Sequence, residues 1–230
     1  MIPLCLTNNV IYYLIVTKNK VMMDYKNQWG NTYSNSEITK LGWYENTPQP
    51  SLDLILSCNL NRDSAILDVG SGTTSLIKYL LQDDYSNIIV TDISKVALDH
   101  AKKYLDPKES EKVKWIVDDV VVPKIITRLT SIDLWHDRTI LHLLLDDEQQ
   151  QAYLKTLRML VSKGGYVIIA AFSLEGAKKF NGLEVKNYDS SMIEEFLGRE
   201  FRLLKHFNYS FKIPSGDLRP YVYTLFQRLT

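Results

Sequence analysis

An acidic residue and two glycines stand together at the end of an apolar run, in a pattern that suits a nucleotide-like ligand. The run ends in Asp68, and Gly70-Ser71-Gly72 follow before a helical pattern begins. Glycines at this position let a ligand lie against bare backbone, where a strand of an open α/β sheet ends and a helix starts. The carboxylate of Asp68 would repel a pyrophosphate and attract an ammonium or a sulfonium group. The expected ligand therefore carries positive charge near this turn.

Acids also close the next two apolar runs. Asp92 follows the β-branched run Asn87 to Thr91 and lies 24 residues after Asp68, near the spacing at which an acid reaches a ribose hydroxyl pair. The run Val113 to Val117 ends in Asp118-Asp119, whose carboxylates can accept a hydrogen bond from an adenine amino group. Three consecutive predicted strands that each end in an acid, at βαβ spacing, are much stronger evidence for a nucleotide-like ligand than a G-x-G pattern alone. Together they favour S-adenosylmethionine over NAD.

With these motifs the chain resembles the class I S-adenosylmethionine-dependent methyltransferases from about Trp29 to the C-terminus, and is most similar to uncharacterised bacterial-type and methyltransferase-like members. The resemblance implies an α/β, Rossmann-like fold with a mostly parallel seven-stranded sheet, an antiparallel last strand and helices on both faces. It also implies S-adenosyl-L-methionine as cofactor, bound by Asp68, Gly70, Ser71, Gly72, Asp92, Ile93, Asp119 and Trp43. Thr74 stands where the family often has a third glycine, so the turn is expected either to lie closer to the cofactor or to donate a hydroxyl.

The reacting centre is expected in a loop after the fourth strand, where His136, Asp137 and Arg138 follow one another. Methyl transfer is an in-line displacement on an activated sulfonium, so the protein mainly aligns the nucleophile and needs a base only when that nucleophile is protonated. His136 or Asp137 is the candidate base. Alternatively, Asp137 and Arg138 pair to brace the loop while His136 lines the cofactor. His142, within the apolar stretch Ile140 to Leu145, is better explained as a hydrogen-bonded core histidine.

An aromatic segment precedes the first strand. Trp29, Tyr33 and the sequence Gly42-Trp43-Tyr44-Glu45 are unlike an ordinary surface helix. The segment either folds over the cofactor as a lid or packs on the sheet as a hydrophobic staple. The loop from Asp217 to Pro220 either reaches the same edge of the sheet or is a plain turn, and the plain turn is favoured.

Alternating helices and strands must position these residues, as a parallel sheet requires. Ser94 is expected to cap its helix, and Gly164-Gly165 to end the longest one. Helices are expected over Pro50–Cys58, Ser75–Leu81, Ser94–Leu105, Asp146–Val161 and Ser190–Leu197, and strands over Ile66–Val69, Asn87–Thr91, Val113–Val117, Ile132–Trp135, Tyr166–Phe172, Lys205–Ile213 and Tyr221–Arg228. The last two strands are expected to form a hairpin.

Length, charge and cysteine content fit a single domain. The 230 residues contain no Pro/Gly/Ser-rich linker, and the 27 basic residues equal the 27 acidic ones, so neither nucleic acid nor a membrane is expected as partner. Cys5 and Cys58 are predicted to be free thiols, without a metal site, in a reducing and hence cytoplasmic compartment.

The N-terminal residues are predicted to form an extension, residues 1–22, outside a methyltransferase domain of residues 23–230. The apolar run Val10 to Val16 is shorter than the roughly 18 residues of a membrane span. We expect translation to begin at Met22-Met23 instead.

The absence of one sequence motif narrows the possible classes of methyl acceptor. Neither N-P-P-Y nor D-P-P-Y follows the fourth strand, which argues against methylation of exocyclic base amines. A small molecule or a protein side chain remains, and in methyltransferase-like lysine methyltransferases an Asp-Lys pair occurs where Asp137-Arg138 stands here. Two alternatives stay open: a non-catalytic module that binds S-adenosylmethionine, and, less favoured, a nicotinamide-dependent oxidoreductase.

Overall fold

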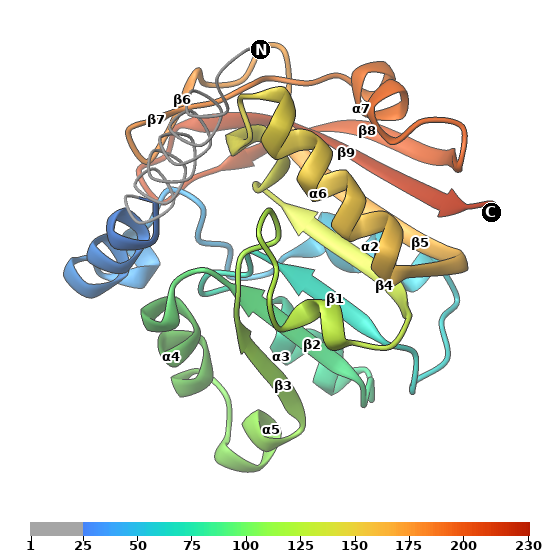
Figure 1. Cartoon of the computed structure of the whole chain (residues 1–230). Coiled ribbons are helices and arrows are strands. Elements are labelled where there is room, and N and C mark those ends of the chain that lie inside the picture. Colours follow the sequence, from blue (N-terminus) through green and yellow to red (C-terminus); the bar gives the residue numbers. More distant parts are fainter. Residues whose placement is uncertain (1–24) are drawn as a thin grey trace, which may run out of the picture.

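Seven strands form one mixed sheet in the computed structural model, which describes residues 25–230 (Figure 1). The strand order is β3-β2-β1-β4-β5-β9-β8. The first five strands run parallel, and β9 is inserted antiparallel between β5 and β8. This arrangement confirms the predicted fold class. The strands are β1 (Ile66–Val69), β2 (Ile88–Asp92), β3 (Val113–Val117), β4 (Ile132–Arg138), β5 (Val161–Phe172), β8 (Phe201–Lys212) and β9 (Leu218–Arg228).

Helices cover both faces of the sheet. One apolar cluster joins the sheet to α2, α3 and α4, and a second joins its opposite face to α6 and α7. In Figure 1, α6 lies in front of the sheet and α2 behind it. The long helices are α2 (Gln49–Ser57), α3 (Leu76–Gln82), α4 (Lys95–Lys103), α6 (Asp147–Leu160) and α7 (Ser190–Leu197), and residues 25–35 are also helical. Shorter elements are η1 (Ile38–Lys40), α5 (Pro107–Glu111), η2 (Ile126–Arg128), η3 (Leu141–Leu143), β6 (Lys179–Phe180) and β7 (Leu183–Glu184).

Capping residues explain where the main helices begin. The side chain of Ser94 accepts a hydrogen bond from the Ala97 amide at the start of α4, as predicted. Asp146 and Asp189 do the same at the starts of α6 and α7. None of the helices in the described part of the chain is both long and apolar enough to cross a membrane.

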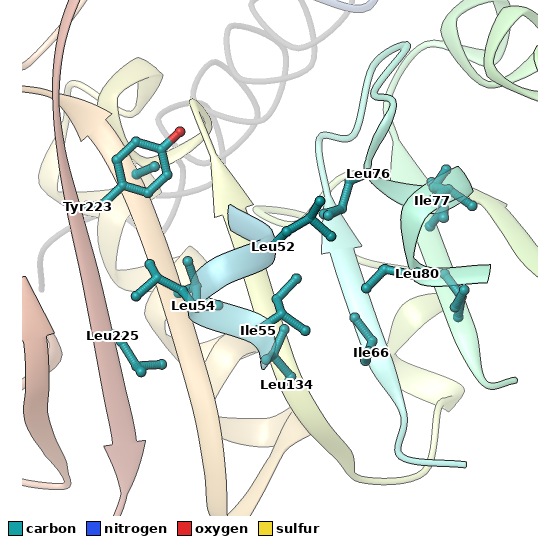
Figure 2. Close-up of a cluster of buried hydrophobic side chains, with 14 of the residues drawn as sticks. Leu52, Leu54, Ile55, Ile66, Leu76, Ile77, Leu80, Leu134, Tyr223 and Leu225 are labelled. Carbon is teal, nitrogen blue, oxygen red and sulfur yellow. The ribbon is translucent and has the colours of Figure 1, made fainter. Parts of the chain in front are cut away.

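The core on the α2 side fixes the position of that helix against the strands (Figure 2). Leu54 and Ile55 of α2 are fully buried together with Ile66 of β1 and Leu134 of β4. Complete burial of each such side chain stabilises the fold by about 1.5 to 3 kcal/mol. These contacts hold α2 against β1 and β4.

Several predicted boundaries are wrong, and β4 matters most. It runs to Arg138 rather than ending at Trp135, so the expected reactive loop is strand. Side chains alternate along a strand, so His136 faces α2 whereas Asp137 faces α6.

Two other predicted ends differ. The Gly164-Gly165 pair does not end α6, because the chain becomes extended at Val161 and both glycines lie inside β5. Strand β8 begins at Phe201, before the predicted Lys205, with an irregular register between Leu203 and Lys205. Burial of Phe201 against the second cluster explains the earlier start.

Three predictions concern residues outside the described part of the chain. They are the N-terminal extension, the translation start at Met22-Met23 and the free thiol of Cys5. Cys58 is a free, buried thiol.

Candidate functional site

A cavity opens at the carboxyl ends of β1, β2 and β4, where the strand order reverses between β1 and β4. Such a reversal creates a crevice in which open α/β sheets bind ligands. Every residue predicted to bind the cofactor lies on the wall of this cavity: Asp68, Gly70, Ser71, Gly72, Asp92, Ile93, Asp119 and Trp43. The structure therefore brings this set together, and cofactor binding by its members stays a prediction.

The glycine turn after β1 needs residues without a β-carbon. Gly70 and Gly72 have φ angles of 59° and 57°, in the left-handed region. A β-carbon at Gly72 would overlap the hydroxyl of Tyr33, which comes from the helix of residues 25–35. Thr74, in place of a third glycine, accepts a hydrogen bond from the Leu76 amide with its hydroxyl oxygen, which satisfies the first amide of α3.

Asp92 ties the end of β2 to this turn. One carboxylate oxygen accepts from the Gly72 amide at 2.8 Å, and the other accepts from the Ser94 amide at 2.7 Å. Burial raises the pKa of Asp92 to about 6, although both backbone donors lower it. Each oxygen retains a lone pair for a further donor.

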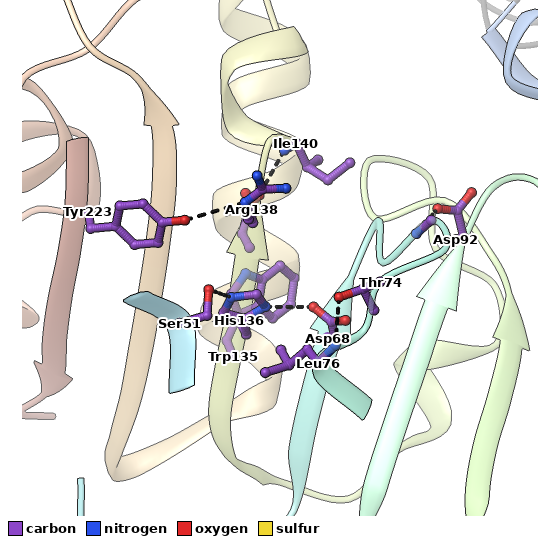
Figure 3. A network of polar contacts seen from close by, with 12 residues as sticks. Ser51, Asp68, Thr74, Leu76, Asp92, Trp135, His136, Arg138, Ile140 and Tyr223 are labelled. Carbon is purple, nitrogen blue, oxygen red and sulfur yellow. Dashed lines mark hydrogen bonds and ion pairs between the residues drawn. The ribbon is translucent and has the colours of Figure 1, made fainter. Parts of the chain in front are cut away.

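Asp68 is linked to two buried polar residues (Figure 3). Its Oδ1 lies 2.6 Å from Nδ1 of His136, and Nε2 of His136 lies 2.8 Å from Oγ of Ser51. All three residues are buried and line the cavity. Oδ2 of Asp68 is buried without a hydrogen-bond partner among the described residues. Because both ring nitrogens of His136 are already engaged, it is not a free base in this structure.

Asp137, the other candidate base, does not line the cavity. Its Oδ1 accepts from the Ile140 amide at 2.7 Å, while its Oδ2 accepts from the Leu141 amide at 3.0 Å and the Tyr153 hydroxyl at 2.7 Å. Burial raises its pKa to about 6, although these donors lower it. Asp137 anchors η3 on the face of the sheet away from the cavity, and its catalytic role stays a prediction that this geometry does not favour.

Arg138 also departs from expectation, because it pairs with Glu45 rather than with Asp137. Its Nη2 lies 3.0 Å from Oε1 of Glu45, and its Nη1 donates to the carbonyl oxygen of Trp43 at 3.2 Å. Its Nε donates to the hydroxyl of Tyr223 in β9 at 3.3 Å (Figure 3). Burial raises the pKa of Glu45, although Arg138 lowers it. This pair was not predicted from the sequence, although Glu45, the acid directly after Trp43-Tyr44, was an available signal for it.

Aromatic rings from three segments pack together over the cavity. The ring centroids of Trp29 and Trp43 lie 5.5 Å apart, and those of Trp43 and Phe180 lie 5.0 Å apart. All three side chains line the cavity. We call Trp29, Tyr33, Trp43 and Phe180 the aromatic cap. Phe180, from β6, was not predicted as part of the site. It lies in a short segment after β5 that contains no recognisable sequence motif.

Asp118 and Asp119, after β3, make different contacts. Asp118 accepts hydrogen bonds from three amides of residues 124–126 and so orders the loop after β3. Asp119 accepts from the Val121 amide at 2.8 Å and lines the cavity.

His142 is confirmed as a core histidine. Its Nδ1 accepts from the Phe172 amide at 3.2 Å, and burial lowers its pKa to about 3.

Comparison with known proteins identifies the family of this site. Residues 66–165 match a family model described as a methyltransferase domain. The chain carries a methyltransferase domain. This match spans β1 to the start of β5, and it confirms the resemblance drawn from Asp68, the glycine turn and Asp92. Among curated protein sequences, none matches the chain significantly.

Solved structures support the fold of this methyltransferase domain. An S-adenosylmethionine-dependent methyltransferase from Anabaena variabilis is 18% identical with a TM-score of 0.73, over 90% of this chain and 95% of that one. The N-methyltransferase NodS from Bradyrhizobium japonicum, in complex with S-adenosylhomocysteine, is 13% identical with a TM-score of 0.67, over 88% and 97%. The 1,6-didemethyltoxoflavin-N1-methyltransferase from Burkholderia thailandensis is 16% identical with a TM-score of 0.62, over 91% and 88%. At these identities the similarity shows the fold alone.

Proposed function

We propose that the methyltransferase domain binds S-adenosyl-L-methionine and transfers its methyl group to a small-molecule acceptor by in-line displacement. The observation that carries the proposal is the cavity wall, where Asp68, the glycine turn, Asp92 and Asp119 meet. The cofactor supplies the methyl group on an already activated sulfonium.

The charge and geometry of the wall fit such a cofactor from one end to the other. The unpartnered Oδ2 of Asp68 suits an ammonium group, because a buried carboxylate oxygen without a donor is costly. Asp92 has lone pairs left for a ribose hydroxyl pair, and Asp119 for an adenine amino group. The glycine turn leaves room for the chain that joins them. A pyrophosphate would instead meet the carboxylate of Asp68, which disfavours a nicotinamide dinucleotide.

The aromatic cap favours a small acceptor over a protein surface. Trp29, Trp43 and Phe180 line the cavity, and the Arg138–Glu45 pair lines it beside β4. Enclosed, mainly apolar pockets with a few polar groups suit small molecules. The name of the Burkholderia thailandensis enzyme likewise states a small molecule as substrate. The equal numbers of acidic and basic residues give no general attraction to nucleic acid.

The protein's contribution to the reaction is mainly alignment. His136 has both nitrogens engaged and Asp137 lies outside the cavity, so neither is free to accept a proton from the nucleophile. We therefore expect an acceptor that attacks with a lone pair. Correct alignment of the two reactants can supply about 7 kcal/mol or more of the barrier reduction.

The experiment is to incubate the purified chain with methyl-labelled S-adenosylmethionine and a soluble lysate, then separate protein from small molecules. Label in the small-molecule fraction supports the proposal, and labelled protein bands show a protein acceptor instead. The lysate without the purified chain is the control, because label found there comes from other enzymes in the lysate. Calorimetry checks the cofactor separately, and tighter binding of NADH than of S-adenosylmethionine would contradict the proposal.

A further inference from the structure

Ser51, His136 and Asp68 form a continuous chain of buried hydrogen bonds that ends at the cofactor cavity (Figure 3). The distances are 2.8 Å from Ser51 Oγ to His136 Nε2 and 2.6 Å from His136 Nδ1 to Asp68 Oδ1. Their exposed fractions are 1%, 3% and 2%. The three residues come from α2, β4 and β1, far apart in the sequence, so local structure does not explain the chain.

We infer that Ser51 and His136 are positioning residues that hold the Asp68 carboxylate in the orientation needed to bind the ammonium group of S-adenosylmethionine. The inference rests on the proposed function and deepens it. Nothing in the glycine motif itself points to Ser51, which lies in the first turn of α2.

The hydrogen-bond chemistry fixes the direction of the chain. An ionised carboxylate can only accept, so Nδ1 of His136 must carry the proton that binds Asp68. In the neutral ring Nε2 is then an acceptor, and the hydroxyl of Ser51 is the donor that satisfies it. Asp68 thus fixes the tautomer of His136, Ser51 holds the ring through Nε2, and His136 fixes one oxygen of Asp68.

The free oxygen shows what this arrangement achieves. With Oδ1 bound by His136, the carboxylate cannot rotate freely, and Oδ2 remains buried in the cavity wall without a partner among the described residues. A buried, unsatisfied acceptor is destabilising unless a ligand completes it. The ammonium group of the cofactor's amino-acid end provides such a donor.

Two substitutions at one position separate the bond to Asp68 from the bond to Ser51. Asn carries its amide nitrogen on Cγ, as Nδ1 of histidine is carried, so His136→Asn can still donate to Asp68. Gln carries its amide one carbon further out, nearer the position of Nε2, so His136→Gln reaches toward Ser51 instead. Ser51→Ala removes the outer end of the chain.

The ligands for calorimetry are S-adenosylhomocysteine, which has the ammonium group, and 5′-methylthioadenosine, which lacks the whole amino-acid end. We expect His136→Gln to weaken S-adenosylhomocysteine about tenfold, as the loss of a hydrogen bond to a charged group implies, and to leave methylthioadenosine within about twofold. His136→Asn should keep both affinities within about threefold of the wild type, and Ser51→Ala should weaken S-adenosylhomocysteine about threefold.

Three results would overturn the inference. Equal loss of both ligands in His136→Gln would make the chain a support for the fold, and thermal unfolding of each variant shows whether the fold has changed. Unchanged S-adenosylhomocysteine affinity with a large fall in kcat would make His136 a base. Equal behaviour of His136→Asn and His136→Gln would remove the bond to Asp68 from the explanation. If the wild type binds neither ligand, the proposed function itself fails, which is a distinct outcome.

Discussion

Replacing Asp137 by Asn tests whether this acid holds the fold together or takes part in the reaction. The carboxylate accepts three hydrogen bonds on the face of the sheet away from the cavity, from the amides of Ile140 and Leu141 and from the hydroxyl of Tyr153. Asn keeps one acceptor oxygen and its NH₂ group cannot accept, so even with that oxygen in the position of Oδ2 the bond from the Ile140 amide is lost. We therefore expect a stability defect with little effect on turnover.

The contribution of Asp137 to the free energy of unfolding depends on pH in a defined direction. The loss of one hydrogen bond to the charged carboxylate costs about 1.5 to 3 kcal/mol. Burial raises the pKa of Asp137 from 3.8 to about 6, so the folded state binds a proton more readily than the unfolded state between these values. The contribution of Asp137 to stability is therefore full below about pH 4 and falls as the pH rises through about 6. The fall is about 3 kcal/mol, from a shift of about 2 pKa units at about 1.4 kcal/mol each.

The assay is urea unfolding of the wild type and Asp137→Asn at pH 4.5 and pH 7.5, with steady-state kinetics at pH 7.5. We expect the variant to be less stable at both pH values, by about 1 to 3 kcal/mol at pH 7.5 and by more at pH 4.5. Its kcat should stay within about threefold of the wild type. Tyr153→Phe, which removes one donor to the same oxygen, is the matched control. A fall in kcat of about 100-fold with unchanged stability would refute the reasoning and restore Asp137 as the base.

Three further predictions concern the cavity wall. Gly72→Ala should weaken the binding of S-adenosylhomocysteine at least tenfold in calorimetry, because the new β-carbon meets the buried hydroxyl of Tyr33 and the left-handed backbone adds a strain of about 1 kcal/mol. Gly30→Ala is the control and should bind normally, because the space around its new β-carbon is open. Asp92→Ala should weaken S-adenosylmethionine by about 1 to 3 kcal/mol, and unchanged affinity would exclude Asp92 from the ribose site. Glu45→Gln should destabilise the fold by about 2 kcal/mol in urea, because it leaves the buried guanidinium of Arg138 without its counter-charge, and equal stability would show that the pair is not needed.

The parts of the site that were predicted correctly depend on local signals. An acid after an apolar run, glycines before a helix and a serine at a helix start all act within a few residues of themselves. Asp68, Gly72, Asp92 and Ser94 therefore lie where the sequence placed them. Three of the four rings of the aromatic cap were singled out from the sequence because they are conspicuous, whereas Phe180 joins them only through its packing on Trp43 and on Phe172 of β5.

His136 and Asp137 show why the rest could not be predicted. Both are polar, and so the sequence places them in a loop, yet both are buried within β4 because distant partners satisfy them. Ser51 is 85 residues away from His136, and no periodic pattern in the sequence predicts the hydrogen bond between them. Once β4 is known to continue, its alternation assigns the two neighbours to opposite faces of the sheet. His136 then belongs to the cavity and Asp137 to the anchoring of η3, so the face on which an acid or base lies, rather than its chemical type, decides its function here.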